Sequence, residues 1–488
     1  MAKTSPPIFH SINFIAPLML ILYLCIGFVP NWQAVDKIAP QWLVMSSLNF
    51  LSILYFTYNR NTLANALSLN LKSFLSLTYI GFFIWAIGSV LYAINPTEVI
   101  VNISRQGNVL LMFLSMGIYL FSMKNKIRFI SWVITFILGI EIYAVLIEAL
   151  DMINTTGSIQ SGTLKGVTAN RNITAFSLAI KLPFVLFLIH LEYKKWIKIV
   201  LCILISLTLI GLSMIQSRAS FIAVGLSTLG YILLHVGIYL KANKKLSQLF
   251  QIGYFIVPLF IALLVNQTLL SSKGADALSR AATISVNTND GSVNQRLRYY
   301  EDVFTHLTLN PIFGVGLGNW KLKSIDYDSK DISGYVVPYH AHSDFIQLGA
   351  ELGIIGFLLY LGVFLWAVYF VYVLIRYSEF GVDKKVFLFL LMIALGVYII
   401  DANLNFPIAR PQVLVVWAVI LALITVYYQK HLTSSQQLQS STKLNWGFLI
   451  LALIFVIPSL YVNNKVYKSL KGQMFLLQDF NSNSYNLP

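Results

Sequence analysis

A short polar stretch near residue 340 gathers the side chains best suited to chemistry. Two histidines are followed by an aspartate, a glutamine and a glutamate, and an apolar segment comes next (His340, His342, Asp344, Gln347 and Glu351). A histidine exchanges a proton near neutral pH, so either one could act as a general base. Two alternatives stay open: a loop histidine satisfied by its neighbours, and a metal site, for which the sequence offers no third ligand at a familiar spacing.

The composition places this stretch in a membrane protein. Of the 488 residues, 57% are hydrophobic and 11% are charged, and the mean hydropathy is +0.73. A soluble globular protein has about 25% charged residues, so this chain cannot cover a water-facing surface of its size. Ionisable groups beside a membrane segment are costly and therefore indicate function. The two cysteines, Cys25 and Cys202, lie in apolar runs, which argues against a disulfide framework or a thiolate metal site.

Apolar runs of about 20 residues predict membrane-spanning helices. We expect about 12 to 13 of them, which makes the fold an all-α polytopic membrane protein. The predicted spans are residues 12–28, 42–58, 74–94, 99–121, 130–150, 173–191, 197–214, 221–240, 249–270, 348–375, 386–400, 413–428 and 446–462. The predicted organisation is an N-terminal set of spans in residues 1–270, a long loop carrying the histidines in 271–347, C-terminal spans in 348–462 and a tail in 463–488.

Loop charge predicts the orientation of these spans. Lysine and arginine collect in alternate loops, and by the positive-inside rule those loops are cytoplasmic. The N-terminus is then cytoplasmic, and the long loop and the C-terminal tail lie on the outer side. Most of the formal net charge of +15 is explained in this way, so we expect no nucleic-acid partner. We expect no cleavable signal peptide, because the first apolar run is long enough to span and lacks a small-residue cleavage site.

Three arginines lie on the predicted outer side, where the positive-inside rule disfavours positive charge. Arg171 precedes the sixth span, Arg218 lies in the very short hairpin between the seventh and eighth spans, and Arg296 lies in the long loop. The guanidinium fork binds phosphate oxygens in a bidentate manner, so three such groups facing one leaflet indicate a polyanionic head group such as a pyrophosphate. The alternative is ion pairing, for instance with Asp151 or Glu301.

The long loop contains two further patterns. Apolar residues recur at spacings of three and four over residues 296–307, which predicts an amphipathic helix on the membrane surface that ends at Asn310-Pro311. Glycines alternate over residues 314–318, but they lack the spacing and the strand context of a nucleotide-binding loop. We therefore expect a tight backbone turn there.

Two acidic residues lie inside a predicted span. Glu141 and Glu148 are seven residues apart on one helix face, and we expect them to pair with Arg105 of the preceding span. The pairing would be mainly structural, with a proton relay as the lesser alternative. Near Pro407, polar residues at the outer end of the eleventh span could line the same cavity as the histidines (Asn403, Asn405 and Arg410).

The histidine spacing resembles a family motif. In the bacterial O-antigen ligase family, a histidine is followed by asparagine, serine or glutamine, then by nine residues of any kind, and then by G-x-x-G. Here His342-Ser343 is followed after nine residues by Gly353 and Gly356. The superfamily includes O-antigen ligases, O-antigen polymerases and protein O-oligosaccharyltransferases.

Three other segments resemble the same superfamily, and two features depart from it. The similar segments are the run from Arg296 to the alternating glycines, the Ser217-Arg218 turn and the entry to the sixth span at residues 166–175. The departures are Tyr299-Tyr300, where members often carry tryptophan, and the additional His340. These departures bear on the subfamily rather than on the class.

The resemblance implies a GT-C-like, inverting, metal-independent glycosyltransferase without a cofactor, in the bacterial inner membrane with its active site facing the periplasm. The donor would be a glycan on undecaprenyl pyrophosphate, and the acceptor of a ligase would be lipid A–core. His342 would activate or position the acceptor hydroxyl, while Arg218 and Arg296 would hold the pyrophosphate, joined by Arg171 from the charge argument. The supporting residues would be His340, Asp344, Gln347, Glu351, Gly353 and Gly356.

The sequence therefore favours an O-antigen ligase, with an O-antigen polymerase or a protein O-oligosaccharyltransferase as the alternative. A lipid-glycan flippase or transporter is the alternative from a different class. A transporter of that kind should show internal repeats and charged residues near the bilayer midplane. The sequence shows no repeat, and its informative residues gather at one membrane face, which favours an enzyme.

Overall fold

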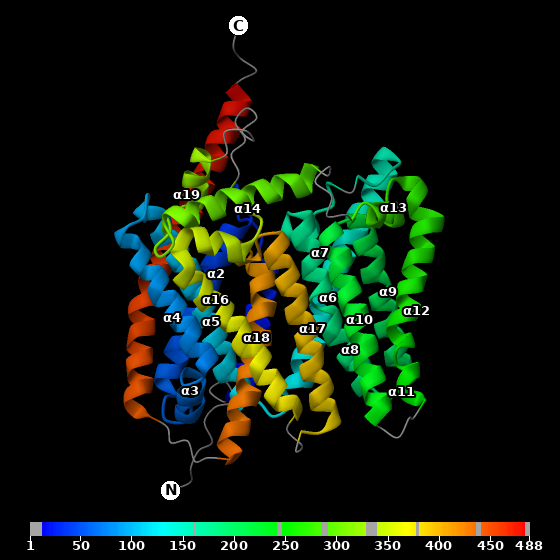
Figure 1. The fold of residues 1–488 in the computed structure, drawn as a ribbon, viewed down its shortest axis with the longest axis horizontal. Coiled ribbons are helices and arrows are strands. Elements are labelled where there is room, and N and C mark those ends of the chain that lie inside the picture. The colour runs from blue at the N-terminus through cyan, green and yellow to red at the C-terminus, as the bar shows by residue number, and fades with distance from the viewer. Residues whose placement is uncertain are drawn as a thin grey trace.

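A computed structural model describes residues 12–160, 162–241, 246–284, 291–327, 339–376, 380–435 and 441–483, which form a bundle of roughly parallel helices (Figure 1). Twelve helices in these ranges are long and apolar enough to cross a membrane, and the shorter apolar helix Ile12–Phe28 adds a further candidate. Each predicted span corresponds to one of these helices, and the described ranges contain no strand. The prediction of an all-α, multi-pass membrane protein is confirmed.

The helices that run through the bundle are α1 (Ile12–Leu24), α2 (Ile38–Tyr58), α4 (Phe74–Gly88), α5 (Pro96–Ser122), α6 (Lys126–Thr156), α7 (Arg171–Ala179) with α8 (Leu182–Leu191), α9 (Lys195–Ile215), α10 (Arg218–Lys241), α11 (Ser247–Phe250) with α12 (Gly253–Val265), α16 (Asp344–Arg376), α17 (Val382–Leu404), α18 (Pro411–Ser435) and α19 (Thr442–Asn483). Shorter helices between them are α3 (Ala64–Leu71), α13 (Ala277–Ala282), α14 (Gly291–Leu309) and α15 (Trp320–Lys323).

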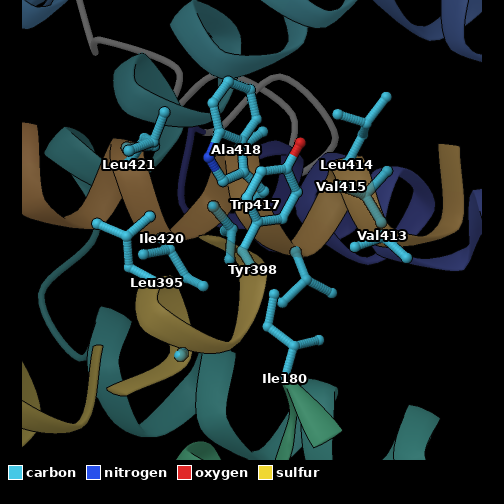
Figure 2. Packing of buried hydrophobic residues seen from close by; sticks show 14 of the residues in the cluster. Ile180, Leu395, Tyr398, Val413, Leu414, Val415, Trp417, Ala418, Ile420 and Leu421 are labelled. Atoms are coloured by element: carbon cyan, nitrogen blue, oxygen red, sulfur yellow. The ribbon is translucent and has the colours of Figure 1, made fainter. Parts of the chain in front are cut away.

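Helix α18 forms the centre of the bundle and packs against both α5 and α16. Trp417 of α18 stacks on Tyr398 of α17, with ring centroids 5.3 Å apart. Figure 2 shows these two rings among aliphatic side chains, including Ile180 at the end of α7. Because lipid tails are as apolar as these side chains, close packing rather than transfer from water holds such helices together. The centre therefore fixes α5, which carries Arg105, and α16, which begins directly after the His342-Ser343 pair.

Helix α14 lies across one end of the bundle, and we call this end the α14 end (Figure 1). Val303 is buried, whereas Leu297 and Phe304 remain exposed on the apolar side of the helix. A helix with one packed and one exposed apolar flank suits the interface of a membrane. Residues 296–307 are helical as predicted, within an α14 that begins earlier, at Gly291, and ends at Leu309, directly before Asn310-Pro311.

The alternating glycines at residues 314–318 form the predicted turn, and this turn packs closely against a kink in α16. Gly353 has a φ of 67° inside α16, and a Cβ atom there would lie 1.9 Å from the carbonyl oxygen of Ile312. Gly314, with a φ of 68°, would place its Cβ 2.4 Å from the carbonyl oxygen of Ala350. Two backbone bonds join the same segments: Val315 N–H to Ala350 O at 3.0 Å and Ile354 N–H to Pro311 O at 2.9 Å.

The structure extends the helices beyond the predicted spans in two places. The tail expected from residue 463 is helical as far as Asn483, because α19 is 42 residues long. Such a helix is about 63 Å long, whereas a bilayer core is about 30 Å thick. Figure 1 shows α19 projecting beyond the bundle at the α14 end. In the long loop, residues 344–347 belong to α16, and α13 and α15 add two short helices.

The predicted pairing of the intramembrane glutamates with Arg105 is wrong. Glu141 accepts a hydrogen bond from the Lys181 ammonium at 2.7 Å, and the pair is buried. Glu148 instead accepts the backbone N–H groups of Lys165 and Gly166, at 3.0 and 2.7 Å. The reason is the order of the helices in space: α6, which carries both glutamates, packs against α8, which begins directly after Lys181.

Candidate active site

His342 lies in the segment directly before α16 and has a left-handed φ of 57°. A residue other than glycine adopts this backbone conformation rarely, and such positions cluster at functional sites. Two tyrosines of α14 hold it there: Tyr300 donates its hydroxyl to the His342 carbonyl oxygen at 3.3 Å, and the Tyr299 ring stacks on the imidazole at 6.2 Å. The imidazole Nδ1 is buried and has no hydrogen-bond partner in the described part of the chain.

The surroundings of His342 keep its imidazole neutral. Burial, reinforced by the positive charge of Arg296, lowers the pKa of His342 from 6.5 to about 4. At neutral pH the ring is therefore unprotonated and can accept a proton. An anion bound at Arg296 would offset that positive charge and raise the pKa of His342. Binding of an anionic ligand at Arg296 would therefore make His342 a stronger base.

His340 is held by a chain of hydrogen bonds. Its Nδ1 lies 3.4 Å from the side-chain oxygen of Gln347, and Gln347 donates to one carboxylate oxygen of Glu351 at 2.9 Å. The other carboxylate oxygen accepts the Gly318 N–H at 2.7 Å. Burial lowers the pKa of His340 to about 4. This series of hydrogen bonds links His340 to the glycine turn at residues 314–318. His340, Gln347 and Glu351, which the sequence predicts as supporting residues, therefore lie together.

Asp344 and the two motif glycines, Gly353 and Gly356, shape the part of α16 that directly follows the histidines. Asp344 accepts the backbone N–H of Ile408 at 2.9 Å and so ties the start of α16 to the short helix Pro407–Ala409. The nine residues between Ser343 and Gly353 form the first part of α16, before its kink. At Gly356, a Cβ atom would lie 2.3 Å from the Cβ of Leu352. The spacing of the motif therefore reflects a short helix followed by a sharp bend.

The three predicted arginines fall into two places at the α14 end. Arg296 lies on α14 and acts electrostatically on His342. Arg171 and Arg218 are the first residues of α7 and α10, two helices that pack against each other. Arg218 donates from Nε to the Thr283 hydroxyl at 3.0 Å. Because a helix N-terminus attracts anions, both positions reinforce the charge of the arginine.

Two cavities open beside the motif. The first, which we call the apolar groove, has a volume of about 440 Å³ and lies between α14, α16 and α17. Its lining includes Phe304, Leu307, Phe345, Ile346, Phe357 and Asn403. The second, which we call the polar chamber, has a volume of about 780 Å³ and lies between α5, α19 and the segment around His340. Its lining includes Arg105, Lys321, His340, Gln347, Glu351 and Arg410.

Sequence reasoning missed two members of this site. Phe406 stacks on His340 and also meets His342, and Lys321 lines the polar chamber. Arg105, which the sequence predicts to pair with the glutamates, lines the same chamber. The one available signal was the polar cluster around Pro407, next to Phe406. Within the described ranges, no three His, Cys, Asp or Glu side chains come together as a set of metal ligands.

Comparison with protein families gives a match that covers the histidine motif. Residues 200–361 match the family model described as O-antigen ligase, and no curated protein matches the chain. The matched segment contains Arg218, Arg296 and the whole histidine motif, whereas Arg171 lies outside it. The match over residues 200–361 therefore supports the O-antigen ligase superfamily for this multi-pass membrane protein, in agreement with the spacing of its histidine motif.

Proposed function

We propose that this protein is an O-antigen ligase-type glycosyltransferase of the bacterial inner membrane. It transfers a glycan from undecaprenyl pyrophosphate to a hydroxyl group of lipid A–core on the periplasmic face. One observation carries the proposal: the neutral imidazole of His342 is under the electrostatic influence of the cation Arg296 and lies next to residues that line the apolar groove. A base, an anion site and a lipid groove are the three parts that such a reaction requires.

His342 supplies the base. An acceptor hydroxyl is a weak nucleophile until its proton is removed, and a neutral imidazole can take that proton. As it does so, the hydroxyl oxygen forms a bond to the anomeric carbon of the first donor sugar. The bond from that carbon to the pyrophosphate oxygen breaks, and its electron pair leaves with the pyrophosphate. This single displacement inverts the anomeric configuration and assigns no step to a metal.

The arginines hold the leaving group. Negative charge develops on the pyrophosphate as its bond to the sugar breaks, and preorganised cations stabilise that charge in the transition state. Of the three, Arg296 is the one whose charge lowers the pKa of His342. Arg218 and Arg171 add positive charge at the starts of α10 and α7, where the helix dipoles also favour an anion. We assign the pyrophosphate to these three guanidinium groups.

The apolar groove receives the carrier lipid. Tyr300 joins the base to this groove, because its single hydroxyl proton is shared between the carbonyl oxygens of His342 at 3.3 Å and of Asn403, a groove residue, at 2.9 Å. Phe304, on the groove wall, is 56% exposed on the outside of α14. A hydrocarbon chain in the bilayer can therefore reach the groove laterally, beneath a helix that lies on the membrane surface.

The decisive experiment offers one donor and three acceptors to the purified protein in liposomes. Glycan-linked undecaprenyl pyrophosphate is supplied with EDTA and with lipid A–core, a second donor molecule or a periplasmic protein, in separate reactions. Transfer to lipid A–core supports the proposal, and transfer in EDTA supports metal independence. Transfer to a second donor makes the protein a polymerase, and transfer to protein makes it an O-oligosaccharyltransferase.

A further control separates transfer from transport. The same liposomes report whether lipid-linked glycan moves between leaflets in the absence of an acceptor. Movement between leaflets without transfer to any acceptor would overturn the proposal and identify a flippase. Transfer without such movement excludes the transporter alternative.

A further inference from the structure

We infer that the polar chamber binds an anionic group, a phosphate or a carboxylate, carried on a sugar of the acceptor, through Arg105 and Arg410. The inference rests on the proposed function, because it assigns the chamber to the acceptor of the transfer. It adds a second anion site, whose two arginines lie outside residues 200–361 and are distinct from the three arginines assigned to the pyrophosphate.

The chamber has the size and the lining of a carbohydrate site. Its volume is about 780 Å³, and its walls come from α5, α19, the glycine turn and the segment before α18. The lining mixes hydrogen-bond donors with acceptors, among them Asn102, Tyr339, Gln347 and Glu351. Sugar hydroxyls both donate and accept, so they need this mixture. An apolar ligand would leave these polar groups without partners.

Two arginines in the chamber have buried N–H groups that nothing in the described residues satisfies. The Nε atoms of Arg105 and Arg410 are both buried and lack a hydrogen-bond partner there. Each guanidinium lies over an aromatic ring: Arg105 over Trp42 at 5.8 Å and Arg410 over Phe406 at 5.1 Å. Stacking fixes the plane of a guanidinium and leaves its N–H edge for an acceptor. Buried polar groups without partners are uncommon and call for a ligand.

The other charges of the chamber are largely satisfied. Lys321 forms an ion pair with Glu98 at 2.8 Å, and both carboxylate oxygens of Glu351 accept N–H groups, from Gln347 and Gly318. Asp36 accepts the N–H of Ile38 at 3.0 Å.

Asp36 is also the carboxylate whose charge acts on both arginines. Glu98, which is paired with Lys321, also acts on Arg105. The chamber lining carries four cations (Arg105, Lys321, Arg410 and Lys465) against three carboxylates (Asp36, Glu98 and Glu351), so it has room for a further negative charge. A bound phosphate or carboxylate would supply that negative charge and would form charge-assisted hydrogen bonds with the guanidinium groups.

The chamber also adjoins the proposed base. Arg410 lies over Phe406, the same ring stacks on His340, and its edge meets His342 at 5.8 Å. The apolar groove approaches this cluster from α14, α16 and α17, whereas the chamber approaches it from α5 and α19. An acceptor anchored in the chamber can thus present a hydroxyl to His342 while the donor occupies the groove.

Binding measurements on the full chain in nanodiscs test the inference directly. Isothermal calorimetry with glucose 6-phosphate, glucuronate, glucose and inorganic phosphate compares a charged sugar with its neutral parent and with the free anion. We expect at least one charged sugar to bind at least tenfold more tightly than glucose and than phosphate. Equal affinity for glucose would overturn the anionic part of the inference, and equal affinity for phosphate would reduce the chamber to a free-anion site.

Substitutions locate the binding. Arg105→Gln and Arg410→Gln should each weaken binding of the charged sugar at least tenfold, and Arg105→Lys should restore part of it, because the charge remains without the fork. Lys468→Gln is the matched control, since it removes one charge from an exposed position of α19 outside the chamber. Unchanged binding in both glutamine variants, with normal thermal unfolding, would overturn the assignment.

The transfer assay separates this inference from the proposed function. If the protein is a transferase, Arg105→Gln should raise KM for the acceptor at least tenfold and leave KM for the donor unchanged. Transfer with an unaltered acceptor KM would contradict the chamber alone. A charged sugar that depends on Arg105 for binding, in a protein that transfers no glycan, would support the chamber and contradict the proposed function.

Discussion

His340 lies face to face with Phe406: the ring centroids are 4.2 Å apart and the ring planes differ by 13°. The same phenyl ring meets His342 at 5.8 Å with its edge. Phe406 belongs to the connection between α17 and α18, outside the matched segment. A residue from outside the matched segment therefore contacts both the motif histidine, His342, and the additional His340. The candidate active site thus depends on packing between helices that are distant in the sequence.

Arg296→Gln should change the pH profile of the reaction. Removing a positive charge near His342 raises the pKa of that residue from about 4 towards its ordinary value of 6.5. A higher pKa leaves less of the neutral base at a given acidic pH. The acidic limb of kcat/KM, which reports the free enzyme, should therefore move to higher pH. Rates measured between pH 4 and 8 check this, with Arg376→Gln at the opposite end of α16 as the control.

An acidic limb at the same pH in both variants would contradict the electrostatic link between Arg296 and His342. The absolute rate of Arg296→Gln should also fall, because the proposed pyrophosphate site loses a cation. The pH of the acidic limb therefore reports the effect of Arg296 on the pKa of His342, and the maximal rate reports its proposed contact with the pyrophosphate.

Arg218→Ala should abolish transfer through loss of donor binding, and Arg218→Lys should recover it only in part. A lysine keeps the positive charge but loses the bidentate fork that matches a pyrophosphate. Equilibrium binding of the lipid-linked donor in nanodiscs, followed by the transfer rate, gives both quantities. Full activity in the lysine variant would refute the pyrophosphate clamp at this position.

Gly353→Ala should destabilise the protein by at least about 2 kcal/mol, since its backbone, with φ 67° and ψ −171°, is a conformation that glycine alone normally adopts and that costs another residue about 1–3 kcal/mol before any clash. The clash is with the carbonyl oxygen of Ile312, 1.9 Å from the new Cβ. Gly139→Ala in α6 is the control, because a Cβ there meets nothing within 4 Å. Thermal unfolding in detergent compares them. Equal midpoints would show that the kink in α16 tolerates a side chain.

Lys181→Met should destabilise the bundle by about 3 kcal/mol, because it leaves the Glu141 carboxylate buried without its cation. Adding Glu141→Leu removes the unpaired charge and should restore most of the stability. Thermal unfolding measures both steps. The transfer rate of the double variant then decides the role of the pair: normal transfer indicates a structural contact, and lost transfer in a stable protein indicates a proton relay.

Much of the fold was predictable because it depends on local sequence. Hydropathy located the spans, since a bilayer admits only long apolar helices. The spacing of Val303 and Leu307 predicted α14, and Asn310-Pro311 predicted its end. Hydropathy could not predict the helical continuation of α19 to Asn483, because residues beyond the span carry no membrane signal.

The candidate site was predictable only where one segment contains it. His342, Gln347 and Glu351 are neighbours in the sequence, and the structure brings them together. Arg105 and Arg410 share a chamber although about 300 residues separate them, and the order of helices that joins them is a result of packing. The same reason explains why Glu141 meets Lys181 rather than Arg105.

The most direct test of the central claim is the transfer rate of His342→Asn in the reconstituted system. Asparagine tolerates the left-handed φ of 57° at this position, so the backbone is kept while the base is lost. His190→Asn, at the opposite end of the bundle, is the matched control. We predict a rate at least about 100-fold below wild type with unchanged donor binding, since a general base contributes about that much or more. A rate within a few-fold of wild type would contradict the role of His342 as the base.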